Sequence, residues 1–185
     1  LDPFETLVGF RDPTRTASLF STLNAGPLVE RLTAPLRGRG GEAALQEVFL
    51  DVLALPEGKR QVVDAVLAAS EECRDDESEL GDFARTALEL NVTFPSDPGI
   101  LAALLMNRVR LQPGAAVYMH PGTMHAHLSG TAIEVMASSD NVLRGGLTNK
   151  HIAVVELVRV VDFSWGEPTI ISGTQTSPGV WDYPT

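Results

Sequence analysis

The spacing of apolar residues changes near Pro95, and this change constrains the fold more than any other feature of the 185-residue chain. Before Pro95, apolar residues recur at intervals of three and four, as in EAALQEVFLDVLAL at residues 42–55, which is typical of packed helices. After it, β-branched residues, glycines and turn-forming residues prevail, which indicates short strands. The sequence therefore predicts an α+β protein, with a helical domain over residues 1–95 and a β portion over residues 96–185.

The helical spacing runs from Asp2 to about Leu90, and the strings QVVDAVLAAS and ELGDFARTALEL repeat it. An acidic run at residues 71–79 is expected to form a solvated loop or a helix end. In the second half, several short strands at regular spacing favour a sandwich or a jelly roll. We expect strands near residues 104–111, 115–119, 125–128 and 132–137, with further β segments near 160–163, 169–171 and 180–183.

The charge of the chain argues against nucleic acids and anionic membranes as partners. The formal net charge is −10, and lysines and arginines form no block. A few arginines at one place can still bind an anionic small molecule, because salt screens the more distant charges. The sequence shows neither a signal peptide nor a run of about 18 apolar residues. The single cysteine, Cys73, is interpreted as a structural thiol and favours a reducing compartment.

Three of the four histidines lie in one short string, HPGTMHAHLSG, which begins at His120. Residues two apart in a strand point to the same face, so His125 and His127 can approach one ion, and Glu134 on the next expected strand can add a carboxylate. With the glycine-containing turn before it, this pattern resembles the metal motif of the cupin superfamily. We interpret His120, at a strand end, as structural or solvent-facing.

Longer strings make the resemblance more specific. Three segments together resemble the type I mannose-6-phosphate isomerases: FETLVGFRDP near the start, the stretch from SDPGILAALLMNRVRL to EVMASSDNVLRGGLTNKHI, and VVELV at residues 154–158. The resemblance is strong over residues 96–158 and weak through the helical region. It implies a cytoplasmic enzyme that binds one zinc ion and interconverts mannose 6-phosphate and fructose 6-phosphate. It also implies a helical insertion domain followed by part of a cupin-type β jelly roll.

The resemblance assigns the zinc ligand His125, because the family has a histidine at this place in a string HAYL. His127 stands where the family has tyrosine, so it is interpreted as a pocket-wall residue, although its same-face position leaves a contact with the metal open. The other family ligands, a Gln-x-His pair and the glutamate of NHKPE, lie upstream and are absent from this sequence. We therefore expect an internal portion of the enzyme that alone binds zinc weakly and is inactive, unless His127 and Glu134 complete the set. Glu134 otherwise has a supporting or structural role.

Three further residues are candidates for the isomerisation itself. Arg144, in NVLRGGLT, corresponds to the family's active-site arginine, and its guanidinium suits either a phosphate or the negative charge of an enediolate. The reaction moves a proton between C1 and C2, which requires an acid/base near the carbonyl. Asp140 resembles a family carboxylate proposed for that role, or else it caps the following turn. Lys150 matches a lysine near the substrate phosphate, although the family more often has proline at the position of Asn149.

Two other functions stay open at this point. One is a cupin oxidoreductase that binds iron through His125, His127 and Glu134, against which the string SDNVLRGGLT argues. The other is a non-catalytic module that binds a sugar phosphate. The expected partner is a small sugar phosphate, with no nucleic acid and no membrane, and the sequence leaves the oligomeric state open.

Overall fold

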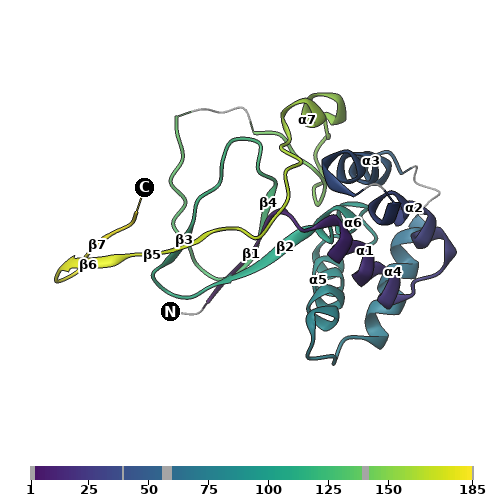
Figure 1. Cartoon of the computed structure of the whole chain (residues 1–185), viewed down its shortest axis with the longest axis horizontal. Helices are drawn as coiled ribbons and strands as arrows, with labels where there is room; N and C mark the ends of the chain where they lie inside the picture. The colour runs from purple at the N-terminus through teal and green to yellow at the C-terminus, as the bar shows by residue number, and fades with distance from the viewer. Residues whose placement is uncertain (1–2, 39, 56–59, 139–141, 185) are drawn as a thin grey trace.

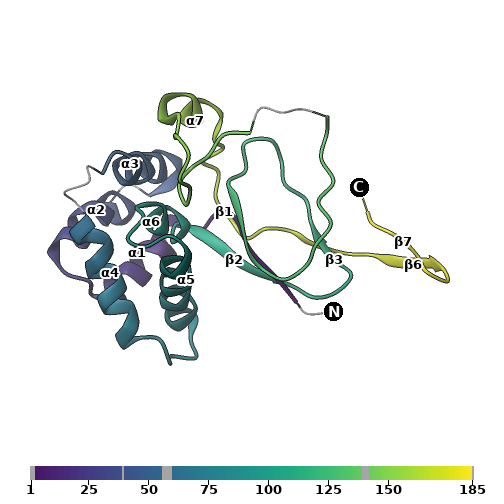
Figure 2. The same cartoon turned by 180° about the vertical axis from the view of Figure 1, so that it is seen from behind.

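The computed structural model describes residues 3–38, 40–55, 60–138 and 142–184. Helices gather at one end, and strands extend from them toward the other end, as Figures 1 and 2 show from opposite sides. The mixed α and β content matches the prediction. In the described part of the chain, no helix combines the length and apolar character needed to cross a membrane.

The helical end is built around side chains that three- and four-residue spacing places on inward faces. Val63 and Val66 of one helix and Ala84 and Ala87 of another are fully buried, and they belong to a single large core cluster. A local contact also fixes the start of the first helix: Asp12 accepts a hydrogen bond at Oδ1 from the backbone N–H of Thr14 (2.7 Å) and so caps it. The six helices of this end are α1 (Pro13–Leu23), α2 (Pro27–Gly38), α3 (Gly41–Leu53), α4 (Arg60–Glu72), α5 (Glu79–Thr93) and α6 (Gly99–Ala103).

A three-stranded antiparallel sheet adjoins the helices. Its central strand is β1 (Phe4–Phe10), which pairs with β2 (Met106–Leu111) on one side and β4 (His125–Ser129) on the other. One face of β1 contributes Leu7 and Phe10 to the large core cluster. The opposite face contributes Val8 to a small second cluster with Val109 and Leu111. Both faces of β1 are therefore covered, and the sheet separates the helical core from the side on which the histidines lie.

The remaining strands extend away from the helices. Strand β3 (Ala115–Val117) pairs with β5 (Ile170–Ser172), and β6 (Thr174–Ser177) forms a hairpin with β7 (Val180–Asp182) at the far end in Figure 1. A seventh helix, α7 (Val154–Val160), lies beside α3, and its Leu157 enters the large core cluster. Trp181 in the hairpin is about half exposed, as is Ile170.

The structure corrects three of the expected elements. The segment Phe4–Phe10, placed in the helical stretch, is a strand, because β2 and β4 supply its hydrogen bonds. Residues 132–137 form no strand: they are exposed, and Ile133 (93%) and Val135 (89%) have no covering neighbours among the described residues. Residues 160–163 are not β either, since Val160 ends α7. The helices expected in residues 42–55, 61–70 and 79–90, and the strands near 104–111, 115–119, 125–128, 169–171 and 180–183, are confirmed within a few residues.

Candidate metal and substrate site

Strand β4 carries the two central histidines. Its side chains alternate in exposure: Ala126 and Leu128 pack against the large core cluster, whereas His125 and His127 lie on the opposite face. In the register with β1, His127 stands opposite Thr6, and His125 stands opposite Val8. Because paired residues of neighbouring strands share a face, the histidines lie on the side of the sheet that faces away from the helices.

The structure brings His125, His127 and Glu134 together. Nε2 of His125 lies 3.8 Å from Oε1 of Glu134, and Nε2 of His127 lies 3.9 Å from Oε2 of the same carboxylate. One ligand atom from each residue fits within 4.8 Å of the other two. These separations are too long for hydrogen bonds, but donors of this kind are those that zinc takes in proteins. The predicted same-face geometry of the histidines is confirmed, and Glu134 joins them from an extended segment rather than from a strand.

Hydrogen bonds at Nδ1 orient both imidazole rings. Nδ1 of His125 lies 3.1 Å from the backbone carbonyl oxygen of Thr123, and Nδ1 of His127 lies 3.2 Å from Oγ1 of the buried Thr6. The ring of Phe4 also packs against His127, with 5.2 Å between ring centroids. The imidazole positions are therefore set by β1 and by the turn before β4, not by the histidines alone.

The other predicted site residues lie in the segment that follows Glu134. Arg144 and Lys150 have exposed side chains, and the backbone N–H of Lys150 donates to Oγ1 of Thr148 (3.2 Å). Asp140 lies outside the described residues. Among the described residues, neither Arg144 nor Lys150 forms a hydrogen bond or an ion pair with His125, His127 or Glu134 through its side chain. Their place in the same site therefore stays a prediction.

Two glycines hold the backbone after Arg144 close to the base of the histidine strand. A Cβ on Gly145 would lie 2.4 Å from Cε of Met124, the residue before His125. Gly146 has a φ of +124°, and a Cβ there would lie 2.7 Å from Cα of Gly99. At Gly146, where the neighbour is backbone and φ is positive, only glycine allows this approach, so the segment that carries Arg144 lies against the start of α6.

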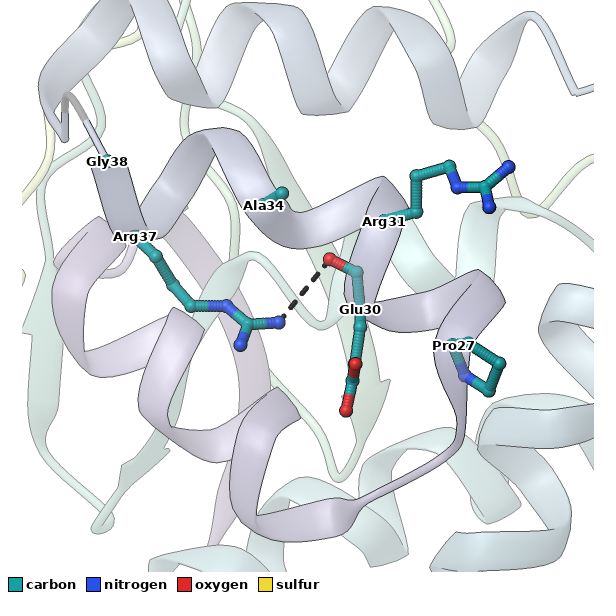
Figure 3. A pocket seen from close by; sticks show the side chains of 6 residues that line it. All are labelled: Pro27, Glu30, Arg31, Ala34, Arg37 and Gly38. Atoms are coloured by element: carbon teal, nitrogen blue, oxygen red, sulfur yellow. Dashed lines mark hydrogen bonds between the residues drawn. The ribbon is translucent and has the colours of Figure 1, made fainter.

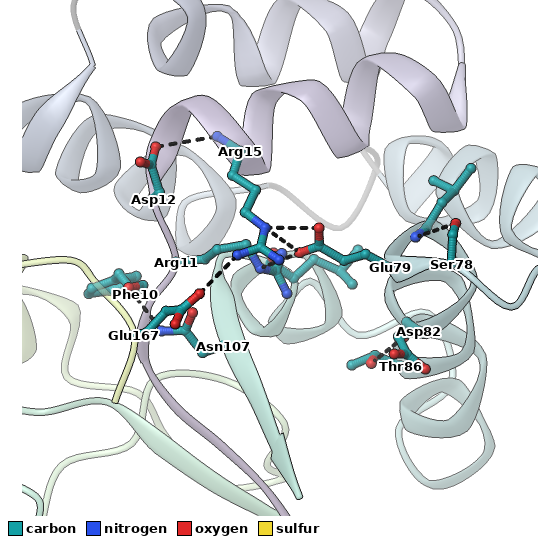
Figure 4. Close-up of polar contacts among 12 residues, drawn as sticks. Phe10, Arg11, Asp12, Arg15, Ser78, Glu79, Asp82, Thr86, Asn107 and Glu167 are labelled. Carbon is teal, nitrogen blue, oxygen red and sulfur yellow. Dashed lines mark hydrogen bonds and ion pairs between the residues drawn. The ribbon is translucent and has the colours of Figure 1, made fainter. Parts of the chain in front are cut away.

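A charged network that the sequence did not reveal lies between the sheet and α5 (Figure 4). Arg11 is buried and donates a hydrogen bond to the carbonyl oxygen of Leu104 (3.1 Å), and its Nε lies 3.7 Å from Glu79. Burial lowers the pKa of Arg11 to about 10, and the nearby Glu79 opposes that change. Arg15 donates to the same carboxylate (2.8 Å), and this hydrogen bond raises its pKa.

The network continues along the sheet to Arg108. Its guanidinium contacts Glu5 and lies 2.9 Å from Glu89. Burial works against the charged form of Arg108, but the hydrogen bonds and charges of Glu5 and Glu89 outweigh it and raise the pKa. These residues line a cavity of about 810 Å³ that also borders Arg11. No local pattern could have predicted the network, since Arg108 and Glu5 are 103 positions apart.

A second hollow lies on α2, far from the predicted residues in sequence. Figure 3 shows Arg37 donating to the backbone carbonyl oxygen of Glu30, and the two atoms are 3.3 Å apart. Arg31 also lines the hollow. It is open, and its lining contains none of the predicted site residues. We therefore place the candidate site at the histidine strand.

Comparisons with known proteins identify relatives of one kind. No protein-family model matches the chain. The mannose-6-phosphate isomerase of Escherichia coli is 35% identical over 165 residues, which make up 88% of this chain and 40% of the relative. The enzyme of the same name from Salmonella typhimurium is 34% identical over 180 residues, 96% of this chain and 43% of the relative. The chain thus spans about two fifths of the length of these curated relatives.

Solved structures agree with the sequence relatives. The crystal structure of the Salmonella typhimurium mannose 6-phosphate isomerase bound to fructose 6-phosphate and zinc superposes with a TM-score of 0.80 at 30% identity, over 99% of this chain and 45% of that one. The apo form of the same enzyme gives a TM-score of 0.81 at 29% identity. Over nearly its whole length, this chain is thus similar in sequence and fold to one part of the mannose-6-phosphate isomerases.

Proposed function

We propose that this chain is part of a zinc-dependent aldose–ketose isomerase that interconverts mannose 6-phosphate and fructose 6-phosphate. The observation that carries the proposal is the match, over 99% of the chain, to a structure bound to fructose 6-phosphate and zinc. The match favours an isomerase over a cupin oxidoreductase or a non-catalytic sugar-phosphate-binding module, because the relatives named above are all isomerases. Since the chain spans about two fifths of those relatives, activity is expected to require the remaining part of the protein.

The donor set at the histidine strand suits zinc. His125 presents Nε2 on the open face of the sheet, while its Nδ1 is held by the carbonyl oxygen of Thr123. An imidazole oriented in this way is a common zinc ligand. When bound, zinc polarises an oxygen of the substrate and makes the neighbouring C–H proton easier to remove.

We assign the remaining chemistry to the segment after Glu134. Asp140 is proposed as the acid/base that moves the proton between C1 and C2. The guanidinium of Arg144 is proposed to stabilise the negative oxygen of the enediolate or to bind the phosphate, and the ammonium of Lys150 to bind the phosphate. The exposed side chains of Arg144 and Lys150, and the glycine anchor beside Met124, support these roles.

We further propose that the strands belong to a cupin-type β jelly roll and that the helices form an insertion before it. The proposed boundary between the helical domain and the β portion is residue 95, except that β1 belongs with the β portion because it joins the sheet of β2 and β4. A cytoplasmic location is proposed as well, supported by the free thiol of Cys73. The partner is a small sugar phosphate.

The test is an isomerase assay on the full-length protein that contains this chain. Purified enzyme is supplied with mannose 6-phosphate, and fructose 6-phosphate is followed by a coupled reaction before and after removal of zinc by a chelator. We expect turnover that is lost on chelation and restored by added zinc. A folded, zinc-loaded protein that converts neither sugar into the other would contradict the proposal.

A further inference from the structure

The segment that carries Arg144 and Lys150 changes its exposure within a few residues. Both of these side chains are exposed, whereas residues 145–148 between them are half-buried. Leu147 packs against the large core cluster, and its φ of +51° lies in the left-handed region, which residues other than glycine adopt rarely. A backbone of this kind persists only where neighbouring groups hold it. The conformation of Leu147 therefore indicates that contacts from elsewhere in the chain fix this segment.

One such contact comes from the carboxylate of Asp97. Its Oδ1 accepts a hydrogen bond from the backbone N–H of Gly99 (2.6 Å) and a longer one from the backbone N–H of Leu147 (3.4 Å). The first contact is local and shapes the turn before α6, but the second joins residues that are 50 positions apart. A charged acceptor forms stronger hydrogen bonds than a neutral one. Asp97 thus ties the start of α6 to the segment between Arg144 and Lys150.

The turn that contains Asp97 is itself fixed on the helical end. The backbone N–H of Ser96 donates to Oδ1 of Asn91 on α5 (2.8 Å), and the hydroxyl of Ser96 donates to Oδ1 of Asp64 on α4 (2.8 Å). The backbone N–H of Asp97 donates to the carbonyl oxygen of Phe94 (3.2 Å). Two helices therefore set the position of the turn, and its carboxylate is a fixed point for the segment that it contacts.

Close packing of backbone supports the same contact. A Cβ on Gly99 would lie 2.5 Å from the backbone nitrogen of Leu147, and one on Gly146 would lie 2.7 Å from Cα of Gly99. Because neither glycine places a side chain between the two segments, the residues after Arg144 lie directly against the turn of Asp97. The hydrogen bond and the packing therefore fix the same point of the segment.

We propose that Asp97 is a positioning residue for the isomerisation: its carboxylate holds the backbone at Leu147 and so places the side chains of Arg144 and Lys150 relative to the substrate. This inference rests on the proposed function and deepens it. Positioning matters because a displacement of about 1 Å in a catalytic group can lower the rate by about 100-fold. The helical end thereby gains a role in catalysis, since α4 and α5 fix the turn that carries Asp97.

The competing role of Asp97 is local and structural. Its hydrogen bond to Gly99 closes a turn that aspartate side chains commonly form with the N–H two residues ahead, and this turn needs no second contact. Asp76 offers a matched control, because its Oδ1 accepts the same kind of hydrogen bond from the N–H of Ser78 (2.6 Å) before α5. Among the described residues, no hydrogen bond joins Asp76 to residues 142–150.

The first experiment measures the contact without using activity. Hydrogen exchange of the full-length protein is followed by mass spectrometry, and peptides that cover residues 142–150 are compared between variants. In Asp97→Ala we expect exchange in this segment to become roughly 5- to 10-fold faster, because the N–H of Leu147 loses its acceptor. Asp97→Asn keeps an acceptor oxygen and should restore most of the protection, and Asp76→Ala should leave the segment unchanged.

Asp97→Ser separates the two contacts and guards against misfolding of the alanine variant. The shorter serine side chain can close the local turn but loses the contact with Leu147, so we expect the same faster exchange in residues 142–150. Unchanged exchange in this segment, in Asp97→Ser and in a folded Asp97→Ala, would overturn the proposal.

The second experiment tests whether Asp97 acts through Arg144. We expect Asp97→Ala to lower kcat with mannose 6-phosphate by roughly 10- to 100-fold, and Asp97→Asn to recover most of the loss. In an Arg144→Ala background, Asp97→Ala should lower kcat by less than about threefold, because the group that it positions is already absent. A purely structural role would lower kcat by the same factor in both backgrounds, and that result would overturn the proposal.

The two experiments separate this inference from the proposed function. A full-length protein without isomerase activity that still shows faster exchange in Asp97→Ser would contradict the proposed function while supporting the anchor at Leu147. An active isomerase whose kcat is the same in Asp97→Ser as in the unchanged protein would support the proposed function and overturn this inference.

Discussion

The hydroxyl oxygen of Thr6 lies 3.2 Å from Nδ1 of His127, although 121 positions separate the two residues in the chain. Thr6 is buried in the central strand of the sheet, so its hydroxyl is fixed, and the imidazole is oriented by a residue from the other end of the chain. The arrangement of His125, His127 and Glu134 therefore depends on the pairing of β1 with β4.

We expect Thr6→Val to weaken zinc binding while preserving the fold. Valine has nearly the shape of threonine but leaves Nδ1 of His127 without its hydrogen-bond partner, and loss of such a supporting contact lowers metal affinity by roughly 10- to 100-fold. Calorimetric titration of the metal-free full-length protein with zinc measures the change. Thr6→Ser restores the hydroxyl and should recover most of the affinity. Equal affinities for the valine and serine variants would show that Thr6 does not orient the ring.

Arg144→Ala is expected to lower kcat of the full-length enzyme by roughly 10²- to 10³-fold, because a positive group that stabilises charge in the transition state is lost. Steady-state kinetics with mannose 6-phosphate measure it. Arg159→Ala is the control: this arginine lies exposed on α7, and its removal should change kcat by less than about twofold.

Lys150→Ala is expected to act mainly on KM. An exposed ammonium that binds the phosphate contributes equally to the ground state and the transition state, so its loss weakens substrate binding with a smaller effect on kcat. Inhibition by inorganic phosphate should weaken in parallel. A variant whose kcat falls while KM and phosphate inhibition stay unchanged would place Lys150 in the chemical step instead.

Arg11→Ala is expected to destabilise the chain by about 2–4 kcal/mol, since it removes a buried donor from the carbonyl oxygen of Leu104 and the packing of the guanidinium over Phe83. Arg11→Met fills most of the space, so it should cost about half as much. Urea denaturation followed by circular dichroism measures both. Arg15→Ala, at an exposed ion pair with Glu79, should cost about 0–1 kcal/mol.

Gly146→Ala is expected to destabilise the chain by about 1–3 kcal/mol, because an alanine is strained at a φ of +124° and its Cβ would meet the backbone of Gly99. Thermal unfolding measures the loss. Gly38→Ala is the matched control, since nothing lies within 4 Å of a Cβ there and its φ is ordinary. Comparable destabilisation of both variants would mean that the close approach at Gly146 is unimportant.

The pairing of His125 and His127 on one face was predictable because alternation along a strand is a local property. The helices were predictable for the same reason, since their three- and four-residue spacing is visible in short windows. Strand β1 was missed because both of its faces are buried, so FETLVGF shows little of the alternation that marks a half-exposed strand.

The position of Glu134 and the charged network could not be predicted, because they depend on contacts between segments that are distant in the sequence. Glu134 reaches the histidines from a segment that was expected to be a strand and is not. Glu134 is therefore brought to the histidines by the course of an extended segment and not by the pairing of a further strand with β4. Arg108 meets Glu5 only when β2 pairs with β1, and Arg11 meets Glu79 only when the end of β1 packs against α5. The spacing of charges along the sequence predicts neither contact.

The central place of β1 sets an order of events during synthesis. Phe4 pairs with Leu111 and Glu5 with Ser129, so β1, which is made before the helices, acquires both neighbours only after the helical region and the turn before β4 have left the ribosome. The helices can form early from local contacts, whereas the sheet must wait for pairings across the chain. The helical region can therefore fold before the sheet that carries the histidines is paired.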